Sequence, residues 1–333
     1  MRSALLERGL KPTTTRMLKR FGWHVVAGFS PRSSIVLMFL TLVGAALLLQ
    51  GQAPSDEIKT FHVQGNVYML VGAGGNIAVQ TGDEGVLVVD TGVATMRDKV
   101  LAAIRQLSTK PIRWMINTHA HPDHTGGNET ISQAGMTVNG NPAAIIAHEN
   151  VPTRMTEASR PITEVPLNTF FEETRDFYFN GEAIFLYHIP RAHTDGDVLV
   201  YFRGSDVLVA GDIFVTTTYP VIDAKYDGGV AGFVDGLNKI LDITVPKYLQ
   251  DGGTYVIPGH GRISDEADVV EYRDMVVIIR DRIQDMIKQG MTLEQVKAAK
   301  PSLDYDGRYG NDKGSWTTGM FIEAVYRDLS QRN

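Results

Sequence analysis

The stretch Thr118–Gly127 reads THAHPDHTGG and places three histidines and one aspartate within six residues, in a chain of 333 residues with nine histidines. It follows an apolar run, IRWMIN, which predicts a buried strand. In an extended chain alternate side chains point to one side, so His119, His121 and Asp123 share a face. His124 has the opposite phase, and a helix that begins at this point would return its imidazole to the same centre. The pattern therefore predicts a metal site.

Three other polar residues stand where an apolar strand ends and glycine begins, which is where sheet proteins concentrate functional residues. The segment IPRAHTDGD contains His193, VLVAGDIF contains Asp212, and YVIPGHGR contains His260. The chain has no cysteine, so a metal must be held by nitrogen and oxygen ligands, both of which zinc accepts. Seven side chains suffice for two metal ions that share one carboxylate: His119, His121, Asp123, His124, His193, Asp212 and His260.

The rest of the sequence alternates short apolar runs and glycine turns with longer amphipathic stretches. Strands are expected at 67–71, 76–81, 85–92, 112–117 and 143–149, and in short runs between 169 and 210. Helices are expected at 95–107, from about 124 to before 135, and at 265–288, 292–300 and 316–329. Thr95 with Asp98, and Thr292 with Gln295, resemble capping boxes. No break separates two domains, and this order predicts an α/β or α+β layered domain.

The first fifty residues have the features of a secretory signal peptide. A basic lead precedes an uncharged apolar run at 35–49, and Gly51 and Ala53 have the spacing of a signal-peptidase site. A membrane-spanning helix needs about 20 apolar residues, so an anchor through an uncleaved 35–49 is the alternative. We expect a signal peptide at 1–53, a periplasmic or secreted location, and a single mature domain at 54–333 that ends in helices at 265–330.

The charge of the chain changes sign at the end of the predicted signal peptide. Residues 1–53 carry seven Lys and Arg and one Glu, whereas the remainder carries 25 basic and 37 acidic residues, a net charge of −12. Such an acidic body is unsuited to binding nucleic acid by neutralising its phosphates. Once the signal peptide is removed, we also expect no stable membrane contact. A small molecule is therefore the expected partner.

The motif H-x-H-x-D-H at 119–124, the later His193, Gly-Asp at 211–212 and Pro-Gly-His-Gly at 258–261 resemble, in this order, the metallo-β-lactamase-fold metallohydrolase superfamily. The resemblance spans roughly 61–262. It implies an α+β fold, an αββα sandwich of two mixed β-sheets flanked by helices, with the site at one edge between the sheets. The aspartate at 212 resembles the ligand set of glyoxalase II and lactonases, whereas the main class of β-lactamases in this superfamily has a cysteine there.

The resemblance also implies a ligand scheme and a reaction. His119, His121 and His193 would hold the first metal, Asp123, His124 and His260 the second, and Asp212 would bridge them. The implied enzyme is a dinuclear zinc hydrolase, in which a metal-bridging hydroxide aligned by Asp123 attacks the carbonyl of an ester, lactone, thioester or β-lactam. Persulfide dioxygenases share the motif but use one Fe²⁺, so a mononuclear iron oxidoreductase is an alternative. A metal-binding protein without turnover is a third reading.

Other residues have expected roles around this centre. Asp90 ends a predicted strand below the site, where a carboxylate can orient a ligand imidazole. Asn76, in a glycine-rich loop, and Tyr219, shortly after the Gly-Asp motif, are candidate substrate contacts, although Tyr219 suits packing equally well. His148 and His188 lie at strand ends outside the motif and are expected to be structural. Substrate specificity is expected to come from the loops 72–76, 149–168 and 214–231.

Overall fold

The computed structural model describes residues 57–249 and 251–331. The chain divides into two units, Met1–Pro54 and Ser55–Asn333, and all described residues belong to the second. The predicted signal peptide at 1–53, with its apolar run at 35–49, lies outside the described residues. Within the described ranges no helix is both long enough and apolar enough to cross a bilayer.

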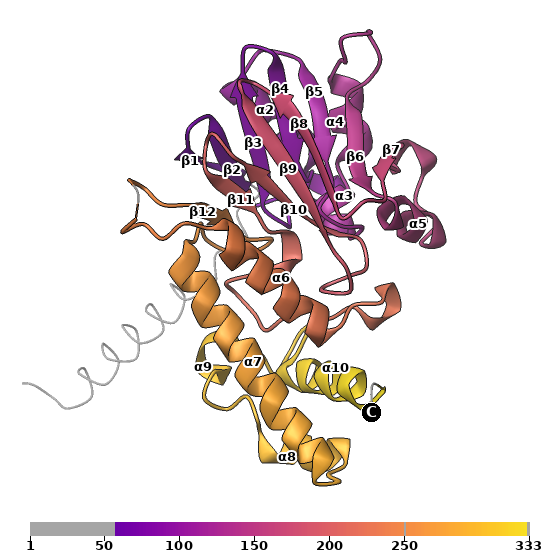
Figure 1. Ribbon diagram of the computed structural model, residues 1–333. Helices are drawn as coiled ribbons and strands as arrows, with labels where there is room; N and C mark the ends of the chain where they lie inside the picture. Colours follow the sequence, from indigo (N-terminus) through magenta and orange to yellow (C-terminus); the bar gives the residue numbers. More distant parts are fainter. Residues whose placement is uncertain (1–56, 250, 332–333) are drawn as a thin grey trace, which may run out of the picture. The chain divides into compact units, whose positions relative to one another are not determined.

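The first sheet has seven strands, which lie side by side in their order along the chain (Figure 1). They are β1 (Lys59–Gln64), β2 (Val67–Val71), β3 (Ile77–Gly82), β4 (Gly85–Val89), β5 (Ile112–Ile116), β6 (Ala144–His148) and β7 (Asn168–Phe170). Strands β1 to β4 pair antiparallel across short turns, and β4 to β7 pair parallel. Parallel pairs need a crossover, and helices between the strands supply it.

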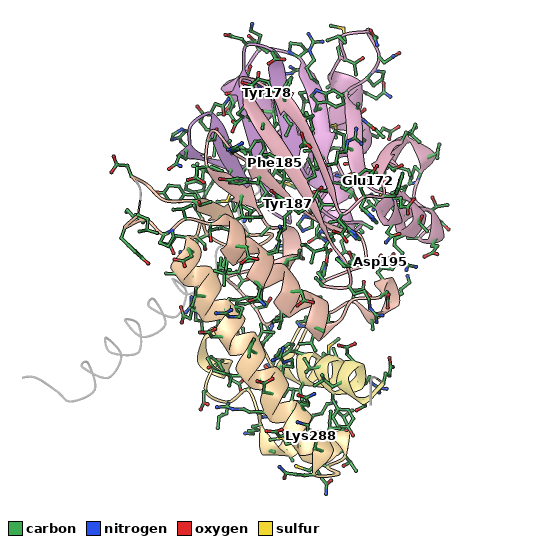
Figure 2. The ribbon with its side chains drawn as sticks, in the orientation of Figure 1. Glu172, Tyr178, Phe185, Tyr187, Asp195 and Lys288 are labelled. Carbon is green, nitrogen blue, oxygen red and sulfur yellow. The ribbon has the colours of Figure 1, made fainter. Side chains whose placement is uncertain are left out.

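The second sheet has five strands in the order β12-β11-β10-β9-β8. They are β8 (Thr174–Phe179), β9 (Glu182–Ile189), β10 (Asp197–Phe202), β11 (Val207–Val209) and β12 (Tyr255–Ile257). Pairing is antiparallel from β8 to β11 and parallel between β11 and β12, so both sheets are mixed. Tyr187, which Figure 2 shows on β9, packs towards the covering helices, and the ammonium of Lys239 lies 4.4 Å from the centre of its ring.

Helices cover the outer face of each sheet. On the first sheet the covering helices are α2 (Arg97–Leu107) and α4 (Asn128–Ala134), while the short helices α3 (Pro122–Thr125) and α5 (Asn150–Glu157) follow β5 and β6. On the second they are α6 (Val230–Ile243), α7 (Glu266–Lys288), α8 (Leu293–Ala299), α9 (Asp306–Tyr309) and α10 (Thr318–Gln331). Short 3-10 turns complete the chain: η2 (Ala94–Met96), η3 (Ile162–Glu164), η4 (Gly211–Ile213) and η5 (Ala224–Tyr226).

Apolar clusters between and outside the sheets hold these layers together. Leu87 of β4 and Leu186 of β9 are fully buried where the two sheets face each other. Ile104 of α2 and Ile131 of α4 pack on the outside of the first sheet, and α6, α7 and α10 pack on the outside of the second. Each such side chain contributes about 1.5–3 kcal/mol on burial. The predicted αββα sandwich of two mixed sheets is confirmed (Figure 1).

The start of α2 differs from the prediction. Thr95 lies inside η2 instead of capping the helix, and neither N-cap residue there forms a side-chain cap bond. The predicted capping box at this position was therefore wrong. The box at α8 is present, with the Thr292 side chain and the Gln295 side chain each bonded to the other residue's backbone amide. A second box, between Asp265 and Asp268, starts α7.

The helix expected from about His124 to before Gly135 is divided into α3 and α4 at Gly126 and Gly127. A Cβ on Gly126 would lie 2.4 Å from the amide nitrogen of Ala94, and one on Gly127 would lie 2.6 Å from the carbonyl oxygen of Thr91. Both contacts are far below normal packing distance. The two glycines therefore let this turn lie directly against the 91–94 segment.

Helix α6 was not predicted, because Gly232 and Gly236 interrupt its apolar pattern and glycine weakens helices. The structure gives both glycines a packing reason. A Cβ on Gly232 would lie 2.1 Å from the carbonyl oxygen of Arg191, and one on Gly236 would lie 2.8 Å from the side chain of Ile213. The helix thus packs closely on the segments that carry His193 and Asp212.

Candidate metal centre

The loop after β5 brings its four polar side chains to one point. His121 keeps an extended backbone (φ −66°, ψ 147°), as expected before proline, and Pro122 starts the one-turn helix α3. That turn returns His124 towards His119, with 4.2 Å between the ring centres. Asp123 lies on the open side, with 36% of its side chain exposed, whereas His124 is fully buried. The helical turn that the sequence predicted at this position is present.

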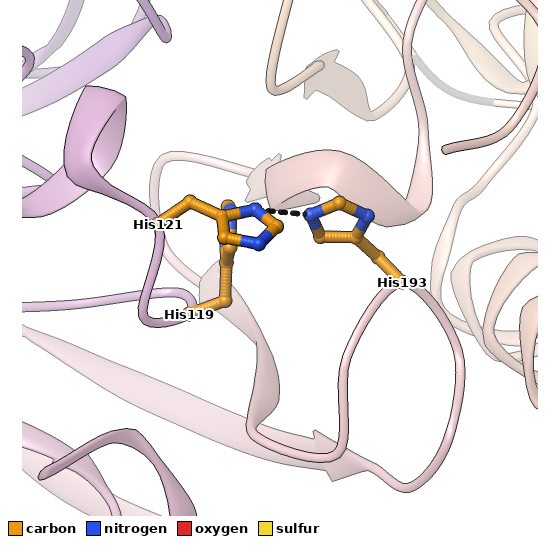
Figure 3. Close-up of side chains that lie close together, drawn as sticks. All are labelled: His119, His121 and His193. Atoms are coloured by element: carbon orange, nitrogen blue, oxygen red, sulfur yellow. Dashed lines mark hydrogen bonds between the residues drawn. The ribbon is translucent and has the colours of Figure 1, made fainter. Parts of the chain in front are cut away.

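The first group of possible ligands is formed by His119, His121 and His193 (Figure 3). Nε2 of His193, from the β9–β10 loop, lies 2.8 Å from Nδ1 of His121. The ring of His119 lies 4.9 Å from that of His121 and 4.7 Å from that of His193. Ligand nitrogens of all three lie close enough together to bind one ion.

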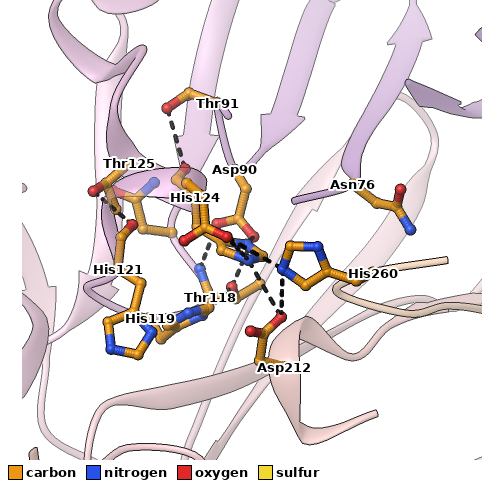
Figure 4. Close-up of polar contacts among 12 residues, drawn as sticks. Asn76, Asp90, Thr91, Thr118, His119, His121, His124, Thr125, Asp212 and His260 are labelled. Atoms are coloured by element: carbon orange, nitrogen blue, oxygen red, sulfur yellow. Dashed lines mark hydrogen bonds and ion pairs between the residues drawn. The ribbon is translucent and has the colours of Figure 1, made fainter. Parts of the chain in front are cut away.

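The second group is formed by Asp123, His124 and His260. Figure 4 shows the rings of His124 and His260 beside Asp212. Oδ2 of Asp123 lies 3.2 Å from Nε2 of His260 and 3.9 Å from Nε2 of His124. Asp212, from η4, lies between the two groups. Its Oδ1 is 3.2 Å from Nε2 of His124, and its Oδ2 is 3.7 Å from Nε2 of His193. The structure therefore brings together all seven side chains that the sequence singled out.

Four of the imidazoles are fixed by the protein through the ring nitrogen that faces away from the centre. The contacts are His119 Nδ1 with Thr118 Oγ1 at 3.0 Å, His121 Nε2 with Asp223 Oδ2 at 2.8 Å, His124 Nδ1 with Asp90 Oδ2 at 2.8 Å, and His193 Nδ1 with the Val221 carbonyl at 2.6 Å. Such partners set the orientation and tautomer of metal-binding histidines. The other nitrogen of each ring is thus directed inwards.

The inward atoms include polar groups without partners. Among the described residues, the buried side-chain atoms that lack a hydrogen bond are His119 Nε2, His124 Nε2, Asp212 Oδ1 and Ser302 Oγ. Three of these four belong to the centre. A buried polar atom left unsatisfied costs about 1–3 kcal/mol, so three at one point call for a common partner. The imidazole nitrogens and the carboxylate oxygen fit a divalent metal ion.

The pKa values of two of the imidazoles and of Asp212 also fit metal binding. Burial, with His124 and His193 nearby, lowers the pKa of His119 well below its usual value, and burial lowers the pKa of His193 to about 4. Both imidazoles are therefore neutral at pH 7 and able to bind a metal. Burial alone would raise the pKa of Asp212, but its imidazole neighbours, His124 first, hold that pKa well below the usual value. Asp212 is thus an ionised carboxylate.

Residues 63–261 match the family model described as the Metallo-beta-lactamase superfamily. This range contains both groups of possible ligands and most of the two sheets. The chain belongs to the metallo-beta-lactamase superfamily. The resemblance drawn from the sequence motifs is therefore confirmed, and the chain has His and Asp groups that could hold a metal ion.

Two curated enzymes are similar to this chain in sequence. The chain is 24% identical over 259 residues to a linear primary-alkylsulfatase of Pseudomonas sp., a match that covers 64% of this chain and 47% of that enzyme. It is 27% identical over 227 residues to a hydroxyacylglutathione hydrolase of Crocosphaera subtropica, covering 65% of this chain and 74% of that enzyme. The chain thus spans about half the length of the alkylsulfatase that it matches.

Solved structures of superfamily members share the fold. A metallo-beta-lactamase from Pontibacter korlensis superposes with a TM-score of 0.54 at 17% identity, covering 66% of this chain and 99% of that one. A stereoselective inverting sec-alkylsulfatase from Pseudomonas sp. gives a TM-score of 0.62 at 16% identity, covering 85% of this chain and 54% of that one. At these identities the likeness concerns the fold alone.

Asp90 lies behind the candidate ligand His124, as the sequence predicted. It is buried, and its backbone adopts a left-handed conformation (φ 63°) that residues other than glycine rarely take. Its Oδ1 accepts a hydrogen bond from the Thr118 amide at 2.8 Å, while its Oδ2 contacts His124 at 2.8 Å. One carboxylate thus links the start of the histidine loop to a candidate ligand at its end.

The two predicted substrate contacts, Asn76 and Tyr219, are both buried. The Asn76 side chain is 3% exposed and donates to the carbonyl oxygens of Pro258 at 2.9 Å and Gly261 at 3.1 Å, so it fixes the turn that carries His260. Tyr219 is 1% exposed, and its hydroxyl lies within hydrogen-bond distance of two acceptors in the C-terminal helical region, the Asp306 carboxylate at 2.7 Å and the Ser302 carbonyl at 3.0 Å. Neither side chain is available to a substrate, and both assignments are corrected to structural roles.

Several residues that position the candidate ligands were not predicted from the sequence. Asp223 contacts His121, and the backbone carbonyl of Val221 contacts His193. Asp197 is buried and accepts bonds from the amide and hydroxyl of Thr194, at 2.8 and 2.6 Å, which closes the turn after His193. Its place in HTDGD, four residues after a candidate ligand, was the available clue. Asp223 had no comparable clue because its partner is distant in sequence.

Proposed function

We propose that this protein is a dinuclear zinc hydrolase that cleaves the carbonyl bond of a small ester, thioester, lactone or β-lactam. The observation that carries the proposal is the convergence of seven ligand-type side chains from separate segments around three buried polar atoms without partners. A structural cluster would satisfy these atoms within the protein, whereas a pair of ions satisfies them together. Two groups of three ligands on either side of Asp212 favour two ions over one.

Zinc suits a centre built from imidazole nitrogens and carboxylate oxygens without thiolates. Divalent ions held there supply a water of lowered pKa and a Lewis acid that polarises the scissile carbonyl. In this scheme His119, His121 and His193 form one ligand set, Asp123, His124 and His260 form the other, and Asp212 serves both. The hydroxyacylglutathione hydrolase relative, named for a thioester substrate class, supports attack on a carbonyl.

Asp123 is proposed to align the attacking water. Its carboxylate is partly exposed at the mouth of the centre. Burial would raise its pKa, but the hydrogen bond from His260 and the charge of His124 lower the pKa to about 2. Oδ2 of Asp123 is therefore ionised at neutral pH and able to accept a hydrogen bond from a water. After bond cleavage, the same oxygen can carry a proton towards the leaving group.

Metal content and substrate range test this proposal together. The mature chain, 54–333, is purified without chelators and its metals are measured by elemental mass spectrometry. We expect about two zinc ions per chain and hydrolysis of at least one thioester, ester, lactone or β-lactam in a panel. One iron per chain with oxygen consumption on persulfides would support the mononuclear iron alternative. Turnover of alkyl sulfates alone would replace the carbonyl substrate with a sulfate ester, as the alkylsulfatase relative suggests.

The variant Asp212→Ala tests the proposed role of the carboxylate that both ligand sets share. Removal of the carboxylate deprives both ligand sets of a shared oxygen, so we expect loss of at least one tightly bound zinc and a fall in kcat of about 100-fold or more. Full turnover with two retained metals would contradict the proposed role of Asp212. Circular dichroism of the variant, compared with the parent protein, separates a local effect from unfolding.

We also propose that the protein is exported, with residues 1–53 removed as a signal peptide. The support is the sequence pattern of the basic lead, the apolar run at 35–49 and the small residues before 54. Expression of the full chain in a Gram-negative host, followed by N-terminal sequencing of periplasmic protein, should yield a chain that begins near Pro54. An intact N-terminus in the membrane fraction would instead support an uncleaved anchor.

A further inference from the structure

Helix α5 packs against both loops that carry the first ligand group. Its buried side chains Val151 and Met155 belong to one apolar cluster with Ala120, the residue before His121. On the other loop, between β9 and β10, a Cβ on Gly196 would lie 3.0 Å from the side chain of Val151. The residues of α5 are not among the candidate ligands. Its contacts therefore concern the position of the ligands.

Asp195, labelled in Figure 2, is the residue through which α5 is bonded to the β9–β10 loop. Its Oδ2 accepts Nη2 of Arg154 at 2.7 Å and Nε at 3.2 Å, and its carbonyl oxygen accepts Nδ2 of Asn150 at 2.8 Å. Its amide donates to the carbonyl oxygen of Tyr226 at 2.8 Å. The side chains of Arg154 and Asp195 are 22% and 14% exposed, so solvent and salt screen this ion pair less than a surface pair.

Arg154 also lies beside the aromatic ring that contacts the other loop. Its guanidinium carbon is 5.7 Å from the centre of the Tyr226 ring, a distance at which cation and ring attract each other. That ring lies 5.7 Å from the ring of His121, at a tilt of 31°. Arg154 is thus connected to both loops: to the His193 loop through Asp195, and to His121 through Tyr226.

The second ion pair of Arg154 differs from the first. Glu157 accepts its Nη1 at 2.8 Å, but this residue lies one turn further along the same helix and is 53% exposed. A pair within one helix cannot fix a neighbouring loop. Arg154 therefore has one partner that joins separate segments, Asp195, and one that does not, Glu157.

We propose that Arg154 is a positioning residue of the first ligand group, which holds His121 and His193 at the separation that suits one ion. This inference rests on the proposed metal centre. Zinc binds imidazole nitrogen at about 2.0–2.1 Å, so a small shift of either loop weakens its binding. Among the described residues, Arg154 makes no printed polar or ring contact with the second ligand group. Its removal should therefore affect one ion more than the other.

Competition with a fluorescent zinc chelator tests the proposal. The variant Arg154→Met keeps the aliphatic stem against α5 but removes the charge and the planar donors. We expect one of the two zinc ions to bind about tenfold more weakly and the other to bind as in the parent protein. The variant Arg154→Lys keeps the charge without the paired donors, so its zinc affinity should lie between those of Arg154→Met and the parent protein.

Glu157→Gln is the matched control, because it removes the other ion pair of Arg154 and should leave both zinc affinities unchanged. Asp195→Asn should weaken the same zinc ion as Arg154→Met, and the double variant should lose no more affinity than either single variant. Unchanged zinc binding in Arg154→Met, or equal weakening of both ions, would overturn the proposal. So would additive losses in the double variant.

Amide hydrogen exchange gives a readout that does not depend on bound metal. Before zinc is added, the segment 193–197 should exchange about tenfold faster in Arg154→Met and Asp195→Asn than in the parent protein, and Glu157→Gln should exchange as the parent does. If the parent binds no zinc but this difference is found, the proposed metal centre fails while the bracing of the His193 loop by Arg154 stands. Equal exchange in all four proteins would contradict the bracing itself.

Discussion

The Oδ2 atom of Asp223 lies 2.8 Å from Nε2 of His121, although 102 residues separate the two in sequence. The contact joins the loop after β5 to the loop after η4. It directs the opposite nitrogen, Nδ1, towards His193, which lies 2.8 Å away. A carboxylate behind a ligand imidazole fixes its tautomer and increases its basicity. Asp223 therefore prepares the orientation in which His121 can bind a metal.

Replacement of Asp223 should weaken metal binding without removing a ligand. Asp223→Ala lets the His121 ring rotate, and we expect zinc affinity to fall by about 10–100-fold. Asp223→Asn keeps an oxygen for the amides of η5 but presents an amide donor to His121, so it should weaken zinc binding through the wrong tautomer. Competition with a fluorescent zinc chelator measures both. Asp227→Asn, which changes an exposed carboxylate of the same loop, should bind zinc as the parent does.

Gly259 is expected to be intolerant of a side chain. A Cβ at this position would lie 1.9 Å from Oδ1 of Asp212 and 2.7 Å from the backbone of Gly211. Gly259→Ala must therefore displace the shared carboxylate, and we expect loss of at least one zinc ion with a strong fall in activity. Gly307→Ala is the control, because no atom lies within 4 Å of the added Cβ. Normal zinc content in Gly259→Ala would show that Asp212 can move without leaving its ligand position.

The parts of the centre that the sequence predicted are those encoded over short distances. His119, His121, Asp123 and His124 lie within six residues, and Pro122 determines the turn that gathers them. His193, Asp212 and His260 were recognised because each follows an apolar run and precedes a glycine. The sandwich itself followed from these motifs through the family resemblance.

The features that the sequence did not predict depend on contacts between residues that are distant in the chain. Helix α6 contains Gly232 because a larger residue would collide with the carbonyl oxygen of Arg191. This contact joins distant parts of the chain, so the sequence alone did not predict the helix. Asp223 resembled any loop aspartate until its partner was known. Tyr219 and Tyr226 occupy the same predicted loop, and the sequence does not distinguish the tyrosine whose hydroxyl is engaged from the one whose hydroxyl makes no bond to a described residue. Three-dimensional packing alone separates these cases.

His148 and His188 form a stacked pair that should make the fold sensitive to acid. One ring comes from each sheet, their centres are 3.5 Å apart and the angle between them is 7°. Burial, followed by the neighbouring His188, lowers the pKa of His148 to about 4, and burial lowers the pKa of His188. Both rings are therefore uncharged at neutral pH, and a proton on either one destabilises the stack.

The lowered pKa values determine how the stability of the fold changes with pH. In the unfolded chain histidine takes up a proton near pH 6.5, whereas folded His148 resists protonation until about pH 4. The pair's contribution to stability is therefore complete above about pH 6.5 and is lost as the pH falls towards 4. Urea unfolding of the zinc-loaded protein and of His148→Phe at pH 7.5, 6 and 5 measures this. The parent should lose roughly 1–2 kcal/mol more than the variant over this range, and parallel losses would contradict the assignment.

Tyr219→Phe should reduce stability and leave substrate binding unchanged. The substitution removes the donor to the Ser302 carbonyl at 3.0 Å and to Asp306 at 2.7 Å, but keeps the stacking of the ring on Phe321. Loss of these buried bonds should cost about 1–2 kcal/mol and lower the Tm by a few degrees. A raised KM in Tyr219→Phe, without a fall in Tm, would return Tyr219 to the substrate site and contradict its role as a packing residue.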